Sequence, residues 1–337
     1  MSKPSQVARM LRSCIELQIP YFLSGPVGAG KSQVVKQVCD ELGMQFVDVR
    51  LSQMDPTDIK GFPSPDAANN IMRWLPADFL PPMLIKGKPN LSKGHVFMDE
   101  MNSAPQMVLA SAYQFVLDRK VGSYTLPVNW TVGGAGNRAE DRSIVNKIPA
   151  ALSDRFLHID YEVDLEDWVA YAMKSGISAE TVAFLRFRSN LLHSFDPTTN
   201  PRSFPTPRSW FAVDKIVRAK TAAADEYALI QGKVGAPAAA EFAAFMRVIA
   251  DLPSIDEIKV APDTTSVPTE PATLYALTTS LSMATDVKHF PRFLQYIERM
   301  DVEWQVVYIR DCLTRCNAVK LTKEYTKWTI AHSDVVL

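Results

Sequence analysis

The sequence predicts an α/β fold in its amino-terminal part, followed by a mostly helical region. Two features of the 337 residues predict the α/β part. A glycine-rich segment, residues 25–32, lies between a short apolar run and a segment whose apolar residues have helical spacing. A second apolar run, residues 95–98, is followed directly by two acidic residues. From Leu165 onward the spacing of apolar residues is mostly that of helices.

The glycine-rich segment matches the pattern G-x-x-x-x-G-K-[S/T] at every constrained position. Its residues are Gly25, Pro26, Val27, Gly28, Ala29, Gly30, Lys31 and Ser32. The flanking residues 19–23 and 31–42 predict a buried strand and a helix. Glycines let backbone N–H groups turn towards one anion, and the helix N-terminus adds a partial positive charge. We therefore expect Lys31 to reach the β- and γ-phosphates of a nucleotide and Ser32 to bind magnesium.

Composition excludes several classes of protein. The net charge is −1, so the chain has no overall basic excess that would indicate binding of nucleic acid. A pore lined locally by basic residues remains an alternative. The four cysteines are too scattered for a disulfide framework, and we expect reduced thiols and a cytoplasmic protein. Neither a signal sequence nor a run of ~20 apolar residues is present, so no membrane partner is expected.

Residues 6–17 predict an amphipathic helix before the first strand, and residues 45–51 predict a second strand. Residues 55–82 follow, rich in proline, glycine and asparagine, and too long for a plain connector. We expect this insert to be a hairpin or loop that projects from the core. An ordinary surface loop is the alternative.

Asp99 and Glu100 close the apolar strand of residues 95–100. If this strand lies beside the strand before the glycine-rich loop, its carboxyl end faces the nucleotide. Asp99 would then hold magnesium, directly or through water, and Glu100 would orient and polarise the attacking water. Two acids at a solvated strand end are the alternative.

Asn137 ends the next predicted strand, residues 130–137, which follows a short extended or hairpin segment at residues 121–127. Its amide could hold the attacking water opposite Glu100, although an asparagine after a glycine is more often a turn residue. Before that strand, residues 104–118 predict a helix that Asn102 or Ser103 can cap. Arg155 precedes a further strand at residues 157–163, and the residues alone favour a solvated or ion-paired role for it.

The helical region contains one more candidate for a phosphate contact. Arg208 lies near the first turn of a predicted helix, where a cation is mildly unfavourable unless an anion lies nearby. A plain surface arginine is the alternative. The clearest helices are predicted at residues 168–173, 179–192, 210–220, 238–250, 274–285, 290–300 and 303–316, with a linker at residues 253–271.

In this order, the glycine-rich loop, the insert, Val-Phe-Met-Asp-Glu, Gly-Asn, Leu-Ser-Asp-Arg-Phe and Pro-Arg resemble a AAA+ ATPase of the MoxR type, in the dynein-related AAA group. The resemblance covers about residues 5–220 and, more loosely, the helical tail. It implies a P-loop NTPase AAA+ core with a parallel sheet of order 5-1-4-3-2 and helices on both faces. A helical lid and a helical C-terminal extension would follow. The expected division is a core at 1–163, a lid at 164–252, and a linker with a small helical module at 253–337.

The resemblance also implies roles for single residues. Residues 25–32 are similar to Walker A, Asp99 and Glu100 to Walker B, and Asn137 to sensor 1. Arg155 is similar to the arginine finger and Arg208 to sensor 2, and the insert is similar to one that faces the pore. The finger motif has serine where leucine is usual, and Arg138 or Arg142 could share the finger's role.

The activity that the resemblance implies is Mg²⁺-dependent hydrolysis of ATP by a ring, usually a hexamer, whose finger acts on the neighbouring subunit. The work would be remodelling or maturation of a protein client, with a partner that carries a von Willebrand factor A domain. Two alternatives stay open. The first is a DNA-acting motor or loader, which the basic residues near the insert would allow. The second is a nucleotide-gated scaffold that hydrolyses little ATP, and the intact set of Glu100, Asn137 and Arg155 argues against it.

Overall fold

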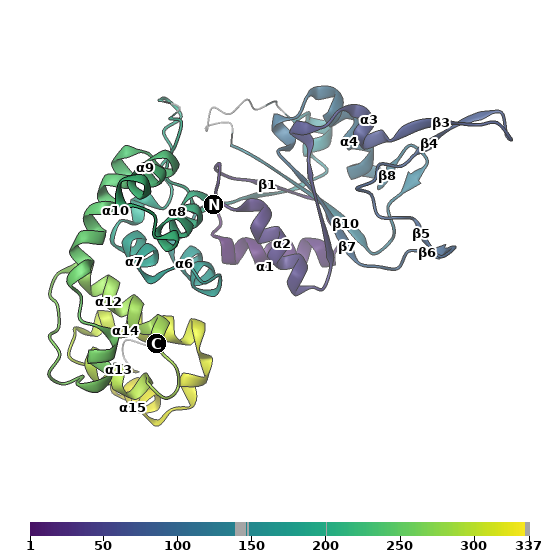
Figure 1. Ribbon diagram of the computed structural model, residues 1–337. Helices are drawn as coiled ribbons and strands as arrows, with labels where there is room; N and C mark the ends of the chain where they lie inside the picture. Colours follow the sequence, from purple (N-terminus) through teal and green to yellow (C-terminus); the bar gives the residue numbers. More distant parts are fainter. Residues whose placement is uncertain (139–145, 147, 200, 334–337) are drawn as a thin grey trace. The chain divides into compact units, whose positions relative to one another are not determined.

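The computed structural model describes residues 1–337 except 139–145, 147, 200 and 334–337. The chain divides into two compact units (Figure 1). The first comprises Met1–Val163 with Asp196–Thr199, and the second Asp164–Phe195 with Asn200–Leu337. The first unit contains the sheet, whereas the described residues of the second form helices and connecting segments.

A five-stranded sheet forms the centre of the first unit. Its strands are β1 (Tyr21–Ser24), β2 (Gln45–Arg50), β7 (Gly94–Asp99), β10 (Trp130–Gly136) and β11 (Leu157–Asp160). They lie in the order β11-β1-β10-β7-β2, and every pair is parallel. Numbered along the chain, this is the order 5-1-4-3-2, so the predicted fold class is confirmed. The strands are close to the predicted ones, but β11 ends at Asp160 rather than at residue 163.

Helices cover both faces of this sheet. They are α1 (Pro4–Glu16), α2 (Lys31–Glu41), α4 (Gln106–Asp118) and the short α5 (Ala150–Ser153). Successive residues of a strand point to opposite faces. In β7, Phe97 accordingly packs in the core of α1 and α2, whereas Val96 and Met98 pack in the core of α4. The central strands β1, β10 and β7 are therefore buried on both sides, as is typical of an all-parallel sheet, whereas the edge strands β2 and β11 are largely exposed.

The insert contains a hairpin that extends away from the sheet in Figure 1. After the short helix α3 (Pro56–Lys60), strands β3 (Phe62–Asp66) and β4 (Ile71–Leu75) pair antiparallel. Gly61 closes the base, where an added Cβ would lie 1.8 Å from the carbonyl oxygen of Leu75. Two smaller hairpins complete the edge of the unit. They are β5 (Leu84–Ile85) with β6 (Lys88–Pro89), and β8 (Lys120–Val121) with β9 (Tyr124–Thr125).

The second unit is built from ten described α-helices. They are α6 (Leu165–Lys174), α7 (Ala179–Phe187), α8 (Pro207–Ala219), α9 (Ala223–Val234), α10 (Ala236–Val248), α11 (Ile255–Val260), α12 (Pro271–Ala284), α13 (Phe290–Ile297), α14 (Val302–Arg315) and α15 (Lys323–Ala331). Short 3₁₀ turns of this unit lie at Ser189–Leu191, Ile249–Asp251 and Asn317–Leu321, and those of the first unit at Leu51–Gln53 and Met101–Ser103. The expectation of a plain linker at residues 253–271 was wrong in part, because Ser254 and Glu257 form a capping box that starts α11. Among the described helices, none combines the length and the apolar character that crossing a membrane requires.

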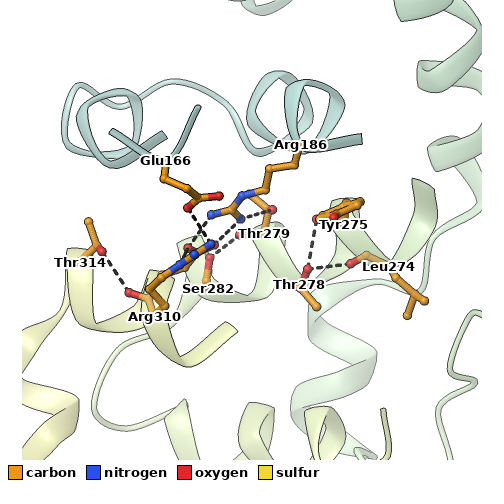
Figure 2. A network of polar contacts seen from close by, with 10 residues as sticks. Glu166, Arg186, Leu274, Tyr275, Thr278, Thr279, Ser282, Arg310 and Thr314 are labelled. Carbon is orange, nitrogen blue, oxygen red and sulfur yellow. Dashed lines mark hydrogen bonds and ion pairs between the residues drawn. The ribbon is translucent and has the colours of Figure 1, made fainter. Parts of the chain in front are cut away.

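A buried ion pair joins helices of the second unit that are far apart in sequence (Figure 2). Arg186 of α7 donates two hydrogen bonds to Asp311 of α14, at 2.5 and 2.6 Å, and one to Thr279 of α12, at 3.2 Å. Glu166 of α6 pairs with Arg310 of α14 at 2.8 Å. Burial lowers the pKa of Arg186, but the hydrogen bonds and charge of Asp311 raise it above its ordinary value. The guanidinium therefore stays charged and links α7, α12 and α14.

Candidate functional site

The glycine-rich loop connects β1 to α2 and has the backbone of an anion site. Gly28 and Gly30 have φ angles of 72° and 95°, a region that glycine enters without steric cost. Gly30 is the N-cap of α2, and no side-chain hydrogen bond caps the helix there. The first N–H groups of a helix have no partner within the helix, and they favour a negative charge. The loop is therefore suited to hold a phosphate group.

Lys31 is the first residue of α2 and is buried, with 8% of its surface exposed. Its Nζ donates to the carbonyl oxygens of Gly25 and Pro26, at 2.9 and 3.0 Å. It also donates to Oδ1 of Asn137 at 3.1 Å. The ammonium thus lies at the glycine-rich loop and touches the tip of β10, which brings two of the predicted site residues together.

Asp99 ends β7, and Glu100 follows it. Strand β10 lies between β1 and β7, as the order 5-1-4-3-2 implies, so β7 is not the direct neighbour of β1. Burial raises the pKa of Asp99, while the N–H of Glu100, at 2.8 Å, and the charge of Lys31 lower it. Asp99 therefore feels the charge of Lys31 across the intervening strand.

Glu100 has a backbone conformation that is unusual for a residue with a side chain. Its φ is 55°, in the left-handed region where non-glycine residues are uncommon and often functional. Its Oε2 accepts a hydrogen bond from the hydroxyl of Ser52, in the 3₁₀ turn after β2. The turn at Glu100 ends the strand directly after Asp99, so both carboxyl groups lie at the carboxyl end of the sheet.

Asn102 has a different role from the one expected. Helix α4 begins at Gln106 after Pro105, without a side-chain cap, so neither Asn102 nor Ser103 caps it. Asn102 is instead buried, and its Nδ2 donates to the carbonyl oxygen of Asn137 at 2.6 Å. The N–H of Asn137 donates back to Oδ1 of Asn102 at 3.1 Å. The cap prediction failed because a 3₁₀ turn and a proline separate Asn102 from the helix.

Tyr161 is a second site residue that sequence reasoning missed. Its hydroxyl donates to the carbonyl oxygen of Ala29 at 3.1 Å, and its backbone lies so close to Gly25 that an added Cβ there would be 3.0 Å away. The signal for Tyr161 is register, since β11 pairs with β1 up to Ser24 and Asp160. Tyr161, which directly follows β11, must then lie beside the start of the glycine-rich loop.

The four arginines considered for phosphate contacts differ in their surroundings. Arg155 is exposed, and no side-chain partner of it is seen in the described part of the chain. Arg138 is half-buried and donates to the carbonyl oxygen of Tyr161 at 2.6 Å, so it is held within its own subunit. Arg208 is exposed in the first turn of α8, where Thr206 caps the helix, and it belongs to the helical unit. Arg142 lies outside the described residues.

The donor set also fits a magnesium ion. Ser32 and Asp99 are half-buried and bear a hydroxyl and a carboxyl group. In the described part of the chain no cluster of three or more histidine, cysteine or acidic side chains could hold a metal. Mg²⁺ beside a nucleotide needs only one or two protein oxygens, because phosphates and water complete its shell. Ser32 and Asp99 therefore match this kind of site better than a metal site built from protein ligands alone.

Comparison with known proteins gives only distant likenesses. No model of a known protein family matches the chain, and no curated protein does. Similar solved structures include NtrX from Brucella abortus in complex with ADP, at 15% identity and a TM-score of 0.40. That match covers 88% of this chain and 63% of NtrX, so this chain spans less than two thirds of that protein. Another is RuvB from Thermotoga maritima, a Holliday junction branch migration motor, at 17% identity, a TM-score of 0.38 and 87% of each chain. Likenesses this distant decide nothing about function.

Proposed function

We propose that this chain is a Mg²⁺-dependent ATPase of the MoxR type. It works as a ring, expected to be a hexamer, that remodels or matures a protein client. The observation that carries the ATPase proposal is the convergence of the glycine-rich loop, Lys31 and Asn137, with Asp99 electrostatically coupled to them. Adenine rather than guanine, the client and a partner with a von Willebrand factor A domain come from the resemblance of the sequence motifs.

In this proposal the glycine-rich loop binds and orients the triphosphate. The backbone N–H groups of residues 28–32 and the ammonium of Lys31 receive the phosphate oxygens. Lys31 leaves its carbonyl partners, Gly25 and Pro26, to do so. Ser32 and Asp99 hold Mg²⁺, which, when bound, neutralises charge that develops on the phosphates. Because burial raises the pKa of Asp99, a proton should compete with Mg²⁺ for its carboxylate at a higher pH than for an ordinary aspartate.

Glu100 and Asn137 act on the attacking water. Glu100 accepts a proton from the water as it attacks, once its carboxylate is released from Ser52. Asn137 holds the water with its amide, and its Oδ1 is already aimed at the ammonium of Lys31. The resemblance of the sequence motifs assigns Arg208 a further phosphate contact, as sensor 2.

Arg155 completes the site of the neighbouring subunit. Its exposure leaves the guanidinium accessible to a second copy of the chain. Arg138 is less suited to that role, because its guanidinium is engaged by Tyr161 of its own subunit. An arginine finger is worth about 10³–10⁵ in kcat in related phosphate-loop enzymes, so the monomer should be almost inactive.

The surface of the insert favours a protein client over DNA. In the β3–β4 hairpin, Pro63 faces Trp74 and Pro65 faces Met72, and these four exposed residues share one face of the ribbon. The only cationic side chain on these two strands, Arg73, forms an ion pair with Asp66. Such a face fits an apolar polypeptide segment and offers little to a phosphate backbone.

The experiment that tests the proposal is complementation between two inactive variants. Glu100→Gln keeps an intact finger but loses the base, and Arg155→Ala keeps the base but loses the finger. Each alone should be at least about 10³-fold slower than the wild type in ATP turnover. A mixture should regain activity, because some interfaces combine an intact site with an intact finger. Turnover per subunit should also rise with protein concentration as rings form.

Other outcomes are equally informative. If Arg155→Ala alone is active, or if the mixture of two inactive variants stays inactive, the finger and the ring mechanism fail. If Glu100→Gln hydrolyses ATP like the wild type, Glu100 is not the base. If Glu100→Gln leaves the biological activity unchanged, a nucleotide-gated scaffold is favoured. Tight, steeply salt-dependent binding of a DNA duplex would favour the DNA-acting alternative.

A further inference from the structure

The carboxamide of Asn102 is bound to both backbone polar groups of Asn137. One hydrogen bond runs from Nδ2 of Asn102 to the carbonyl oxygen of Asn137, and the other from the N–H of Asn137 to Oδ1 of Asn102. Asn137 follows β10 directly, beyond the last residue of that strand. The two bonds therefore fix the orientation of the Asn137 peptide groups beyond the end of β10.

We call the two hydrogen bonds between Asn102 and the backbone of Asn137 the clamp. The atoms around it are closely packed. An added Cβ at Gly136 would lie 2.3 Å from Oδ1 of Asn102, so only glycine lets the carboxamide approach the strand. Asn102 is itself held, because its carbonyl oxygen accepts a hydrogen bond from the N–H of Asn146 at 2.6 Å. Asn102 is 5% exposed, so water does not compete strongly for these bonds. The clamp thus acts from a fixed point two residues after Glu100.

The orientation that Asn102 imposes is passed on to the side chain of Asn137. The Oδ1 of Asn137 accepts from Nζ of Lys31 at 3.1 Å, so the amide lies where the glycine-rich loop presents its cation. A rotation of the Asn137 backbone would move this amide away from Lys31. Positioning errors of about 1 Å can slow an enzymatic step by about 10²-fold.

We propose that Asn102 is a positioning residue that holds Asn137 against Lys31 for ATP hydrolysis. This inference rests on the proposed ATPase function. Asn102 touches neither nucleotide nor water in this role, and it acts only through Asn137. Loss of its carboxamide lowers kcat and leaves nucleotide binding nearly intact, because the glycine-rich loop is unchanged.

The matched control is Asn90, which makes the same kind of clamp elsewhere in the first unit. Its Nδ2 donates to the carbonyl oxygen of Pro82 at 2.8 Å, and its Oδ1 accepts from the N–H of Ser92 at 2.9 Å. Asn90 is 3% exposed, close to the value for Asn102. Asn90→Ala and Asn102→Ala therefore remove equivalent hydrogen bonds, one set away from the site and one set at it.

The test measures kcat and KM for ATP in the assembled protein. Asn102→Ala should lower kcat about 10- to 100-fold with KM within a few-fold of the wild type, and Asn90→Ala should leave both unchanged. In an Asn137→Ala background, Asn102→Ala should have almost no further effect on kcat, because the side-chain amide whose position Asn102 sets is absent. Equal losses of kcat with and without Asn137 would overturn the proposal. Asn102→Asp, which keeps an acceptor oxygen but replaces the amide donor with a second oxygen and adds a charge when ionised, provides a second variant if the alanine variant does not fold.

A readout without ATP separates this inference from the proposed function. In the nucleotide-free protein, amide hydrogen exchange at Asn137 should be faster in Asn102→Ala than in the wild type, and unchanged in Asn90→Ala. If the wild type hydrolyses no ATP, the proposed function fails, while faster exchange would still establish the clamp. If exchange at Asn137 is unchanged, the clamp and the inference built on it both fail.

Discussion

Lys31 and Arg186 are two buried cations with opposite surroundings. Their exposed fractions are 8% and 7%. Arg186 in the helical unit binds the carboxylate of Asp311 through two hydrogen bonds and the hydroxyl of Thr279 through a third. Lys31 in the α/β unit donates to two backbone carbonyl oxygens and one side-chain amide. The carboxylate cancels the charge of Arg186, whereas neutral oxygens stabilise an ammonium without cancelling its charge.

This difference separates a structural cation from one that can bind an anion. A bidentate arginine–carboxylate pair is among the strongest polar contacts in proteins, and it has no reason to open. Carbonyl oxygens can be exchanged for phosphate oxygens at little cost, because phosphate is the better acceptor for an ammonium. Burial alone therefore does not reveal the functional cation, and the charge of its partners does.

The largest effect is expected when the structural pair is broken from one side. Asp311→Leu leaves the guanidinium of Arg186 buried without its counter-charge and should cost about 3–5 kcal/mol of unfolding free energy. The double variant Arg186→Met with Asp311→Leu should recover most of that loss, since an apolar pair of similar volume needs no counter-charge. The Nε of Arg186 has no hydrogen-bond partner, which lowers the net value of the native pair further. Urea denaturation of the three proteins measures these differences. An equal loss in the double variant would contradict the account.

Lys31→Met tests the other side of the comparison. Turnover of ATP should fall about 10²–10³-fold, as expected for the loss of one charged donor at a reacting phosphate. The unfolding midpoint in urea should change little, because the hydrogen bonds of Lys31 to Gly25, Pro26 and Asn137 all go to neutral oxygens. Arg186→Met is the matched control. Its unfolding free energy should be lower than that of the wild type, and its ATP turnover should be nearly normal at a temperature at which it is folded. If both variants lose stability and spare turnover, Lys31 is a structural cation as well.

Local sequence patterns predicted the elements of the first unit well. The strands β1, β2, β7 and β10 begin and end within two residues of their predicted bounds, because each is either an apolar run or, in β2, an alternating segment. The sheet order came from the resemblance and not from the residues. Helices α9 and α15 were not predicted.

The candidate site was predictable only where its residues are close in sequence. The glycine-rich loop, Lys31 and the pair Asp99 and Glu100 are local motifs, and their geometry follows from the strand and helix beside them. The contacts of Asn102 with Asn137 and of Tyr161 with Ala29 join residues 35 and 132 positions apart. They depend on the register of parallel strands, which a single sequence does not specify. The roles of the catalytic residues themselves stay predictions.

His95 is a third buried basic residue, and its hydrogen-bond partners are neutral hydroxyl groups. Its ring lies in the sheet between the hydroxyls of Tyr21, at 2.8 Å, and Thr131, at 2.7 Å. Burial lowers the pKa of His95 to about 3 from its ordinary value of 6.5. Below pH 6.5 the unfolded chain binds a proton that the folded chain refuses, so stability is lost as the pH falls from 6.5 towards 3.

The expected loss from His95 is about 1.4 kcal/mol for each pH unit in this window. His95→Gln cannot take up a proton. The fall in its unfolding free energy between pH 6.5 and pH 5.5 should be smaller by about 1 kcal/mol, less than the full slope because the unfolded histidine is half protonated at pH 6.5. Urea denaturation at the two pH values measures the slope. The same slope in both proteins would mean that another group carries the acid sensitivity.

The smallest effect is expected at two tyrosine hydroxyls that make the same bond in different places. Tyr161 donates to the carbonyl oxygen of Ala29 in the glycine-rich loop, at 3.1 Å, and Tyr124 donates to that of Pro81, at 2.7 Å. Tyr161→Phe and Tyr124→Phe should each cost about 0.5–1.5 kcal/mol of stability. Only Tyr161→Phe should also weaken nucleotide binding, by a few-fold, because it loosens the loop that receives the phosphates. Equal nucleotide affinity in the two variants, measured by titration calorimetry, would show that the loop holds its shape without Tyr161 and that its glycines and Lys31 suffice.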